Sequence, residues 1–428
     1  MAYKETTTTS WGSRLGGSFR GIGIGIILII AGTVLLWWNE GNFVRTGDAL
    51  TEAQGITQEL GDIQTVNAAL NGKLVHATGP VATTDVLTDP DFQISTNAVR
   101  LERSVEFFQW KENSKSEKRK KLGGGEETVT VYTYATGWTQ APVNSSGFHD
   151  PDAVKNKVNS VLMPLQSSKV QAKNVTLGAY RLPDFLIGSI SGATDLAVAI
   201  PAETVKNLNK QLAPPSPEAQ NTQQSQQEQA SLPGLAQRIF APQPKLPDMV
   251  HVSGSTVYIG LSPATPQIGD VRISYKEVRP ATVSLLAKLN GSTFEVFLAS
   301  NGKSVSSLHM GEASVENMYG SAHSSNSMMT WIFRGLGVLL VVIGLKMVFS
   351  PIAVLADVIP PLGSLVGAGL GLASTLIGLA WSLLVMAIAW IRFRPMIGGI
   401  MVGVAVVLIA LVFIKGRSGK AAKPEVVQ

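Results

Sequence analysis

The spacing of long uncharged apolar segments constrains the fold of this 428-residue chain more than any other feature. The first segment, residues 21–39, reads GIGIGIILIIAGTVLLWWN and covers about 28 Å of hydrocarbon as a helix. Roughly 290 residues pass before three more segments follow, at 331–349, 362–391 and 395–414. We therefore predict an α+β multipass membrane protein with four transmembrane helices, one N-terminal and three C-terminal, and a large β-rich domain at 40–330.

The residues that flank the first segment indicate whether it is cleaved as a signal peptide. Trp37 and Trp38 stand where an interfacial aromatic belt is expected. A cleaved signal peptide is the alternative, but the segment is long and residues 34–40 offer no small-x-small cleavage site. We therefore expect an uncleaved signal anchor.

The C-terminal segments contain cations, prolines and regularly spaced glycines. Arg334 and Lys346 lie near the ends of the second segment, where long side chains reach the headgroups; for Lys346 a buried ion pathway is the alternative. Residues 350–362, SPIAVLADVIPPL, favour a short interfacial turn. The third segment has glycines every four residues, which indicate either a helix-packing seam or the general abundance of glycine in membrane helices. The seam residues are Gly363, Gly367 and Gly371.

The charges at the ends of the chain set the expected orientation. The N-terminal tail, residues 1–20, and the C-terminal tail, 415–428, are both basic, so the positive-inside rule places both in the cytoplasm. The domain is then extracytoplasmic, in the periplasm or an organelle lumen. Arg392 and Arg394, in the turn WIRFRP, lie on the domain side against this rule. Our hypothesis is that they anchor the domain by contacting Glu40, or that they bind lipid phosphates.

Alternating apolar and polar residues predict that the first half of the domain contains a long β-hairpin. Residues 98–112, AVRLERSVEFFQWKE, and 127–138, ETVTVYTYATGW, are typical of two paired strands. The basic stretch 111–121, KENSKSEKRKK, then lies at the hairpin tip. One register of the first strand contains Val99, Leu101, Val105 and Phe107, and the other contains Phe108 and Trp110.

The second half of the domain reads as an antiparallel meander. Residues 269–278 and 282–289 have strand patterns, and Asn290-Gly291 and Asn301-Gly302 are tight-turn signals that lead into further strands. Between the halves, residues 207–248 are rich in Gln, Pro and Ser. This composition favours a disordered or loosely helical insertion.

Several phrases spread along the chain resemble the transmembrane protein 43 family, also called LUMA proteins. They are Asn39-Glu40-Gly41, KLVHATGPVATTDVLTDPDF, VRLERSVEFFQWKE, VYTYATGW, QIGDVRISY, SNSMMTWIFRGLG and the RFRP turn. The family-like positions are Asn39, Glu40, Gly41, Trp110, Trp138, Gly269, Asp270, Trp331 and Arg334.

The resemblance implies four spans with the large domain on the non-cytoplasmic side. It also implies self-association and a role in organising membrane protein complexes, because animal members behave in this way in the endoplasmic reticulum and inner nuclear membrane. This sequence departs from the family in its Gln-rich insertion, its glycine seam and its lack of cysteine. These departures favour a bacterial member in the inner membrane, whereas a eukaryotic member would belong to the endoplasmic reticulum or inner nuclear membrane.

The residues offer little support for catalysis or for a cofactor. With no cysteine there is no disulfide, thiolate metal site or catalytic thiol. Gly302-Lys303-Ser304 imitates the end of a phosphate-binding loop, but Phe297 replaces the first glycine, and a turn between strands is the simpler account. The histidines do not form the helical pair of a zinc hydrolase, and we interpret them as structural or surface residues. They are His76, His149, His251, His309 and His323.

Two charged groups allow more than one interpretation. Asp85, Asp89 and Asp91 place three carboxylates together, either as solvated turn residues or as a site for a hard cation or acid–base chemistry. The basic stretch 111–121 is either a solvated hairpin tip or a surface for anionic lipid or nucleic acid. In the expected orientation this stretch does not meet nucleic acid, so we expect no nucleic-acid partner.

We therefore predict a self-associating, non-catalytic scaffold for membrane or envelope complexes, without a cofactor or metal. Its expected partners are the lipid bilayer, copies of itself and other membrane proteins. The alternatives are an extracytoplasmic sensor of lipid or stress, a transporter or channel, and a membrane-tethered enzyme.

Overall fold

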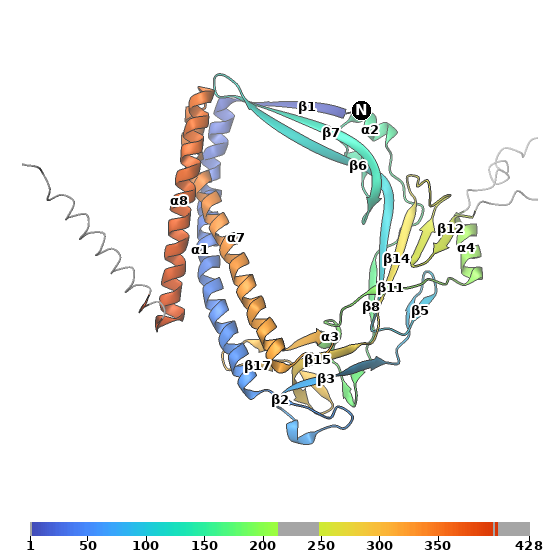
Figure 1. The fold of residues 1–428 in the computed structure, drawn as a ribbon. Helices are drawn as coiled ribbons and strands as arrows, with labels where there is room; N and C mark the ends of the chain where they lie inside the picture. Colours follow the sequence, from blue (N-terminus) through green and yellow to red (C-terminus); the bar gives the residue numbers. More distant parts are fainter. Residues whose placement is uncertain (1, 213–247, 397–398, 401–428) are drawn as a thin grey trace, which may run out of the picture.

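Three long helices form one side of the molecule (Figure 1). They are α1 (Trp11–Ile56), α7 (Val315–Ala356) and α8 (Pro360–Phe393) in a computed structural model that describes residues 2–212, 248–396 and 399–400. Each is long and apolar enough to cross a membrane. Most of the fourth predicted span, most of the Gln-rich insertion and the whole C-terminal tail lie outside the described residues.

Each long helix extends beyond the span predicted for it. The Ser10 hydroxyl caps α1 by accepting from the Ser13 amide at 3.2 Å, and the Ser314 hydroxyl caps α7 in the same way. α7 continues through the buried Pro351, so the turn predicted at 350–362 is reduced to the three residues between α7 and α8. The helices therefore reach past the apolar segments into the β region.

Close contact between α1 and α7 depends on glycines outside the predicted packing seam. A Cβ on Gly25 would lie 2.6 Å from the Gly344 carbonyl oxygen, and one on Gly32 would lie 2.8 Å from that of Gly337. In each helix these glycines are seven residues apart, so they share one face. A side chain at either position would push the two backbones apart.

The predicted seam on α8 has a different environment from this crossing. Gly363 packs against Asp357, in the connection between α7 and α8. Gly367 and Gly371 have no atom within 4 Å of a Cβ position among the described residues. These two glycines therefore form no helix contact within the described part of the chain.

The predicted hairpin is the centre of an eight-stranded sheet. β6 (Arg100–Lys120) pairs with β7 (Glu126–Thr139) along its length, and β6 also pairs with β14 (Val271–Val278). The sheet order is β1 (Ala2–Thr9), β7, β6, β14, β13 (Thr256–Ile259) and β12 (Val250–Ser253), with β8 (Ser168–Gln171) on β6 and β11 (Thr194–Asp195) on β14.

A second, seven-stranded sheet lies at the other end of the β region. Its order is β19 (Ser307–Met310), β15 (Thr282–Asn290), β16 (Thr293–Glu295), β10 (Tyr180–Arg181), β9 (Val175–Leu177), β3 (Leu74–Thr83) and β2 (Gln58–Glu59). β15 also pairs with β3, which closes five of the strands into a cycle. The meander prediction is therefore wrong at its start: β14 and β15 follow each other in the chain but belong to different sheets.

The remaining elements are short. They are the strand pairs β4 (Leu87–Asp89) with β5 (Ile94–Thr96) and β17 (Phe297–Leu298) with β18 (Ser304–Val305), the helices α2 (Pro151–Asn156), α3 (Asp184–Ile187) and α4 (Ala202–Leu212), and the 3-10 turns Ala68–Leu70 and Ser145–Gly147. The Asn290-Gly291 turn joins β15 to β16 as predicted, with Gly291 at φ +59°.

The main hydrophobic core joins the two sheets. Of the two registers predicted for the first strand of the hairpin, the one that contains Val99, Leu101, Val105 and Phe107 is buried, and strands of both sheets pack around it. A second cluster joins the end of α1 and the start of α7 to this region, through Ala49, Ala53, Met318, Tyr319, Leu74 and Leu286. The β region is thus packed directly onto one end of the helices.

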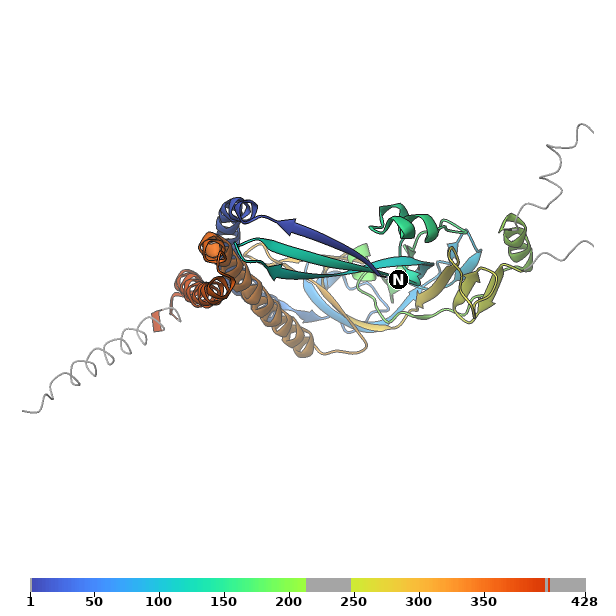
Figure 2. The ribbon, with the colours of Figure 1, turned by 90° about the horizontal axis from the view of Figure 1, so that it is seen from above.

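The β region also contacts the opposite end of the helices (Figures 1 and 2). The β6–β7 hairpin and β1 run from the sheet to the start of α1 and the α7–α8 connection. The Gly123 amide at the hairpin tip donates to the Val358 carbonyl at 3.1 Å. The Trp11 indole donates to the Val354 carbonyl at 2.9 Å and packs over Gly124.

This closure has a topological consequence for a chain that crosses a membrane. β1 precedes α1 and pairs over all eight of its residues with β7, which follows α1. A bilayer crossed once by residues 21–39 would separate residues 2–9 from residues 126–139 by about 30 Å of hydrocarbon. The β1–β7 pairing and a single crossing by α1 therefore exclude one another in the same molecule at the same time.

Candidate functional site at the base of the helical bundle

A buried carboxylate joins the three long helices where the apolar part of α1 ends. Glu40 is 1% exposed and accepts from Arg334 Nε at 2.6 Å and Arg334 Nη2 at 2.7 Å. Its Oε2 also accepts from the Trp390 indole at 2.6 Å. A paired guanidinium and an indole donor offset the cost of burying the charge, so loss of either charged partner would leave the other uncompensated.

The residues on each side of Glu40 bond to the same neighbouring helices. The Asn39 amide donates to the Thr330 carbonyl of α7 at 3.1 Å. Gly41 lies under the Phe393 ring of α8, where a Cβ would be 2.6 Å from its Cζ atom. The motif Asn39-Glu40-Gly41 is therefore a three-helix junction, which we call the base junction together with Arg334 and Trp390.

The prediction that Arg392 or Arg394 pairs with Glu40 is wrong. The guanidinium of Arg392 lies 5.8 Å from the Phe393 ring, and that of Arg394 lies 5.1 Å from the Phe43 ring. Arg334 takes the place next to Glu40 because α7 packs along α1, whereas the two arginines lie at or beyond the last turn of α8. Neither has a carboxylate partner among the described residues.

An apolar groove of about 450 Å³ opens beside the base junction, between α7 and α8. Arg334 is the one charged residue in its described lining, and the guanidinium lies 4.7 Å from the Trp331 ring and 5.7 Å from the Trp390 ring. The other lining residues are Gly335, Val338, Leu383, Met386 and Ala387. This volume falls within the range of about 300–1,000 Å³ that is usual for ligand sites.

The other family-like positions support the eight-stranded sheet. The buried Asp270 accepts from the Tyr258 hydroxyl and from the Gln267 amide, and burial together with this carboxylate raises the pKa of Tyr258. Gly269 precedes it at φ +101°, a left-handed conformation that favours glycine. Trp138 stacks 4.4 Å from the Arg272 guanidinium, and Trp110 contacts the Lys157 ammonium.

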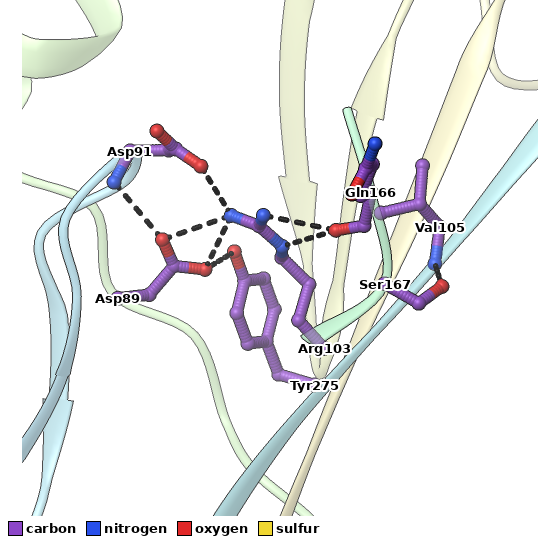
Figure 3. A network of polar contacts seen from close by, with 7 residues as sticks. All are labelled: Asp89, Asp91, Arg103, Val105, Gln166, Ser167 and Tyr275. Atoms are coloured by element: carbon purple, nitrogen blue, oxygen red, sulfur yellow. Dashed lines mark hydrogen bonds and ion pairs between the residues drawn. The ribbon is translucent and has the colours of Figure 1, made fainter. Parts of the chain in front are cut away.

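The three aspartates of the first half do not form a joint cation site. Arg103 Nη1 donates to Asp89 at 2.9 Å and to Asp91, while Asp89 also accepts from the buried Tyr275 hydroxyl at 2.7 Å (Figure 3). Burial and the Asp89 carboxylate raise the pKa of Tyr275, so it remains a hydrogen-bond donor. Asp85 instead accepts from the backbone amides of residues 173 and 174.

The basic hairpin tip is only partly solvated. Lys115, Lys118 and Arg119 are exposed, but Lys120 Nζ lies 2.5 Å from Asp357 in the α7–α8 connection. Arg14 of α1 binds the same carboxylate at 2.6 Å. Burial raises the pKa of Asp357, but the bonds from Lys120 and Arg14 outweigh it and hold the pKa below its ordinary value.

The remaining candidates have structural surroundings. His76 is buried between Glu59 at 2.7 Å and the Ala313 carbonyl at 2.9 Å. His149 pairs with Glu112 and stacks on Tyr132. Residues 2–212, 248–396 and 399–400 contain no group of three or more metal-ligand side chains. Lys303 follows a turn and donates to the Asn42 side chain, and Lys346 is exposed on α7.

The sequence of this chain is similar to those of known membrane proteins. Residues 107–395 match the family model described as "Transmembrane protein 43". The chain is 25% identical to human transmembrane protein 43 over 407 residues, covering 94% of this chain and 92% of the human protein. It is 26% identical to the mouse protein over 386 residues, covering 90% and 87%. The Drosophila melanogaster homolog is 25% identical over 396 residues, covering 87% and 89%. No solved structure matches the chain significantly.

Proposed function

This chain belongs to the transmembrane protein 43 family and is an integral membrane protein, and we propose that it acts as a non-catalytic, self-associating scaffold for membrane protein complexes. The observation that carries self-association is the open glycine face of α8. Gly367 and Gly371 have nothing within 4 Å of a Cβ position among the described residues, and Leu372, beside them, is 63% exposed. Small residues on an exposed apolar helix allow a second helix to approach closely.

The proposal of a structural role rests on how the buried charges are used. Among the described residues, the Glu40 side chain bonds to Arg334 and Trp390, and that of Asp89 bonds to Arg103 and Tyr275. These groups already have their hydrogen-bond partners within the described chain, as expected of groups that hold elements together. The partners we propose are the bilayer, further copies of the chain and other membrane proteins, without nucleic acid.

For the inserted protein we propose that both tails face the cytoplasm and that the large domain faces the periplasm or an organelle lumen. The basic tails support this orientation. The β1–β7 pairing and the contacts of the hairpin tip with residues 357 and 358 oppose it, so this orientation requires both to separate when α1 and α7 cross the bilayer. The membrane is the bacterial inner membrane for a bacterial source, or the endoplasmic reticulum and inner nuclear membrane for a eukaryotic one.

The self-association proposal is tested by the mass of the purified protein in a mild detergent. We expect the wild-type chain to form a homo-oligomer and the double variant Gly367→Leu, Gly371→Leu to shift toward the monomer. The control is Gly369→Leu, because Gly369 is also open but points to a different side of α8. A monomeric wild-type protein, or equal masses for the double variant and the control, would refute the proposal.

A further inference from the structure

The groove beside the base junction combines an apolar trough with a single cation at its end. Its walls are aliphatic and aromatic side chains of α7 and α8. Trp331 and Trp390 border it near the end of the apolar part of the helices, where tryptophans usually mark the level of lipid headgroups. A ligand that fits both parts has an apolar chain and a polar head at this level.

The Arg334 guanidinium retains an unused donor in this groove. Nε and Nη2 bind the two oxygens of Glu40, and the tryptophan rings lie against the guanidinium. Nη1 has no hydrogen-bond partner among the described residues, and it is not fully buried. It is therefore accessible to a ligand, and an apolar helix laid in the groove would leave it without an acceptor.

The charge around the groove favours an anion. Glu40 is neutralised by Arg334, while Arg392 and Arg394 follow Trp390 at the same end of α8 without a carboxylate partner in the described chain. These two arginines therefore add positive charge at this end of α8. An anionic headgroup offers the acceptor oxygens and the charge that this arrangement lacks.

We propose that the groove binds one anionic glycerophospholipid, with its phosphate accepting from Arg334 Nη1 and an acyl chain lying between α7 and α8. The site is a specific lipid site and differs from general contact of the helices with the bilayer, because it pairs a defined guanidinium with a defined trough. This inference goes beyond the scaffold role and does not depend on self-association.

The test is native mass spectrometry of the full chain after incubation with phosphatidylcholine vesicles that contain phosphatidylglycerol. Ala387→Trp fills the groove without removing a charge. Its matched control is Ala380→Trp, which lies two turns away on the same face of α8 and is exposed but outside the groove lining. Arg334→Lys is the second variant, because a lysine keeps the charge but not the forked donor set that serves Glu40 and a phosphate together.

We expect wild-type protein and Ala380→Trp to retain one phosphatidylglycerol, and Ala387→Trp and Arg334→Lys to retain it about tenfold less, the factor given by one charge-assisted hydrogen bond. Circular dichroism and thermal unfolding identify variants that fail to fold. Equal retention by the Ala387 and Ala380 variants would overturn the proposal, as would equal retention of phosphatidylcholine and phosphatidylglycerol. Lipid retention by a folded Ala387→Trp variant at the wild-type level would also overturn it.

Discussion

The pairing of β1 with β7 leads to a sharp test, because it links residues on the two sides of a predicted span. Thr6 faces Val129 in the register, and the chain contains no cysteine, so Thr6→Cys with Val129→Cys gives a clean cross-linking pair. A disulfide needs Cα atoms within about 4.4–6.8 Å, whereas a bilayer crossed by α1 would hold the two residues about 30 Å apart.

The expected result depends on whether the protein is inserted. In detergent solution we expect the disulfide to form and to close a loop of more than 100 residues, which adds about 5 kcal/mol to the free energy of unfolding in the chain-entropy model. In intact membranes we expect no disulfide, and labelling of the two cysteines by an impermeant maleimide from opposite sides. Thr6→Cys with Thr133→Cys is the control, because Thr133 faces Ala2 instead.

Each outcome decides one part of this reasoning. A disulfide in intact membranes would refute a single crossing by α1 and the proposed orientation. If the Thr6–Val129 cysteine pair cross-links no better in detergent than the Thr6–Thr133 control, the β1–β7 pairing in solution is refuted. Labelling of both cysteines from the same side in membranes would likewise contradict the crossing, whatever the disulfide yield.

Three further predictions concern the helices and their contacts. Glu40→Gln should lower the free energy of unfolding in detergent by about 3–5 kcal/mol, because it removes the counter-charge of the Arg334 guanidinium, whose side chain is only 14% exposed; an unchanged melting temperature would show that the pair is not needed. Gly25→Leu should separate α1 from α7 and destabilise the bundle, whereas Gly23→Leu, which meets no atom within 4 Å, should not; thermal unfolding compares the two. Asp357→Asn should free the hairpin tip in detergent, seen as faster amide hydrogen exchange there. Since the pKa of Asp357 is lowered in the folded chain, its contribution is complete above its ordinary pKa of 3.8 and is lost as the pH falls through the lowered value.

Periodicity in the sequence was sufficient for the main elements of the fold. The alternation in β6 separated its two registers and predicted its pairing with β7, whereas which register is buried became clear only from the packing of the two sheets. Three of the four predicted spans are parts of the long helices α1, α7 and α8, and most of the fourth lies outside the described residues. β1 was missed, since YKETTTT has few apolar residues and its strand is defined by the edge of β7.

These local patterns could not predict contacts between distant segments. The phrase Asn39-Glu40-Gly41 marked the right place, but pairing Glu40 with Arg334 required the packing of α7 along α1. The glycines at the α1–α7 crossing are seven residues apart, whereas the four-residue spacing typical of a packing seam occurs on the open face of α8. The strand patterns of β14 and β15 did not show that these two consecutive strands belong to different sheets.

The uninterrupted length of α1 gives the molecule a mechanical property. Its last 16 residues, 41–56, continue beyond the apolar segment for about 24 Å and end in the cluster that holds β3 and β15. No hinge separates the two parts of this rod, so a tilt of the bundle by about 10° would displace the attached sheet by about 4 Å. A change in bilayer thickness that tilts the helices would therefore also move the attached sheet.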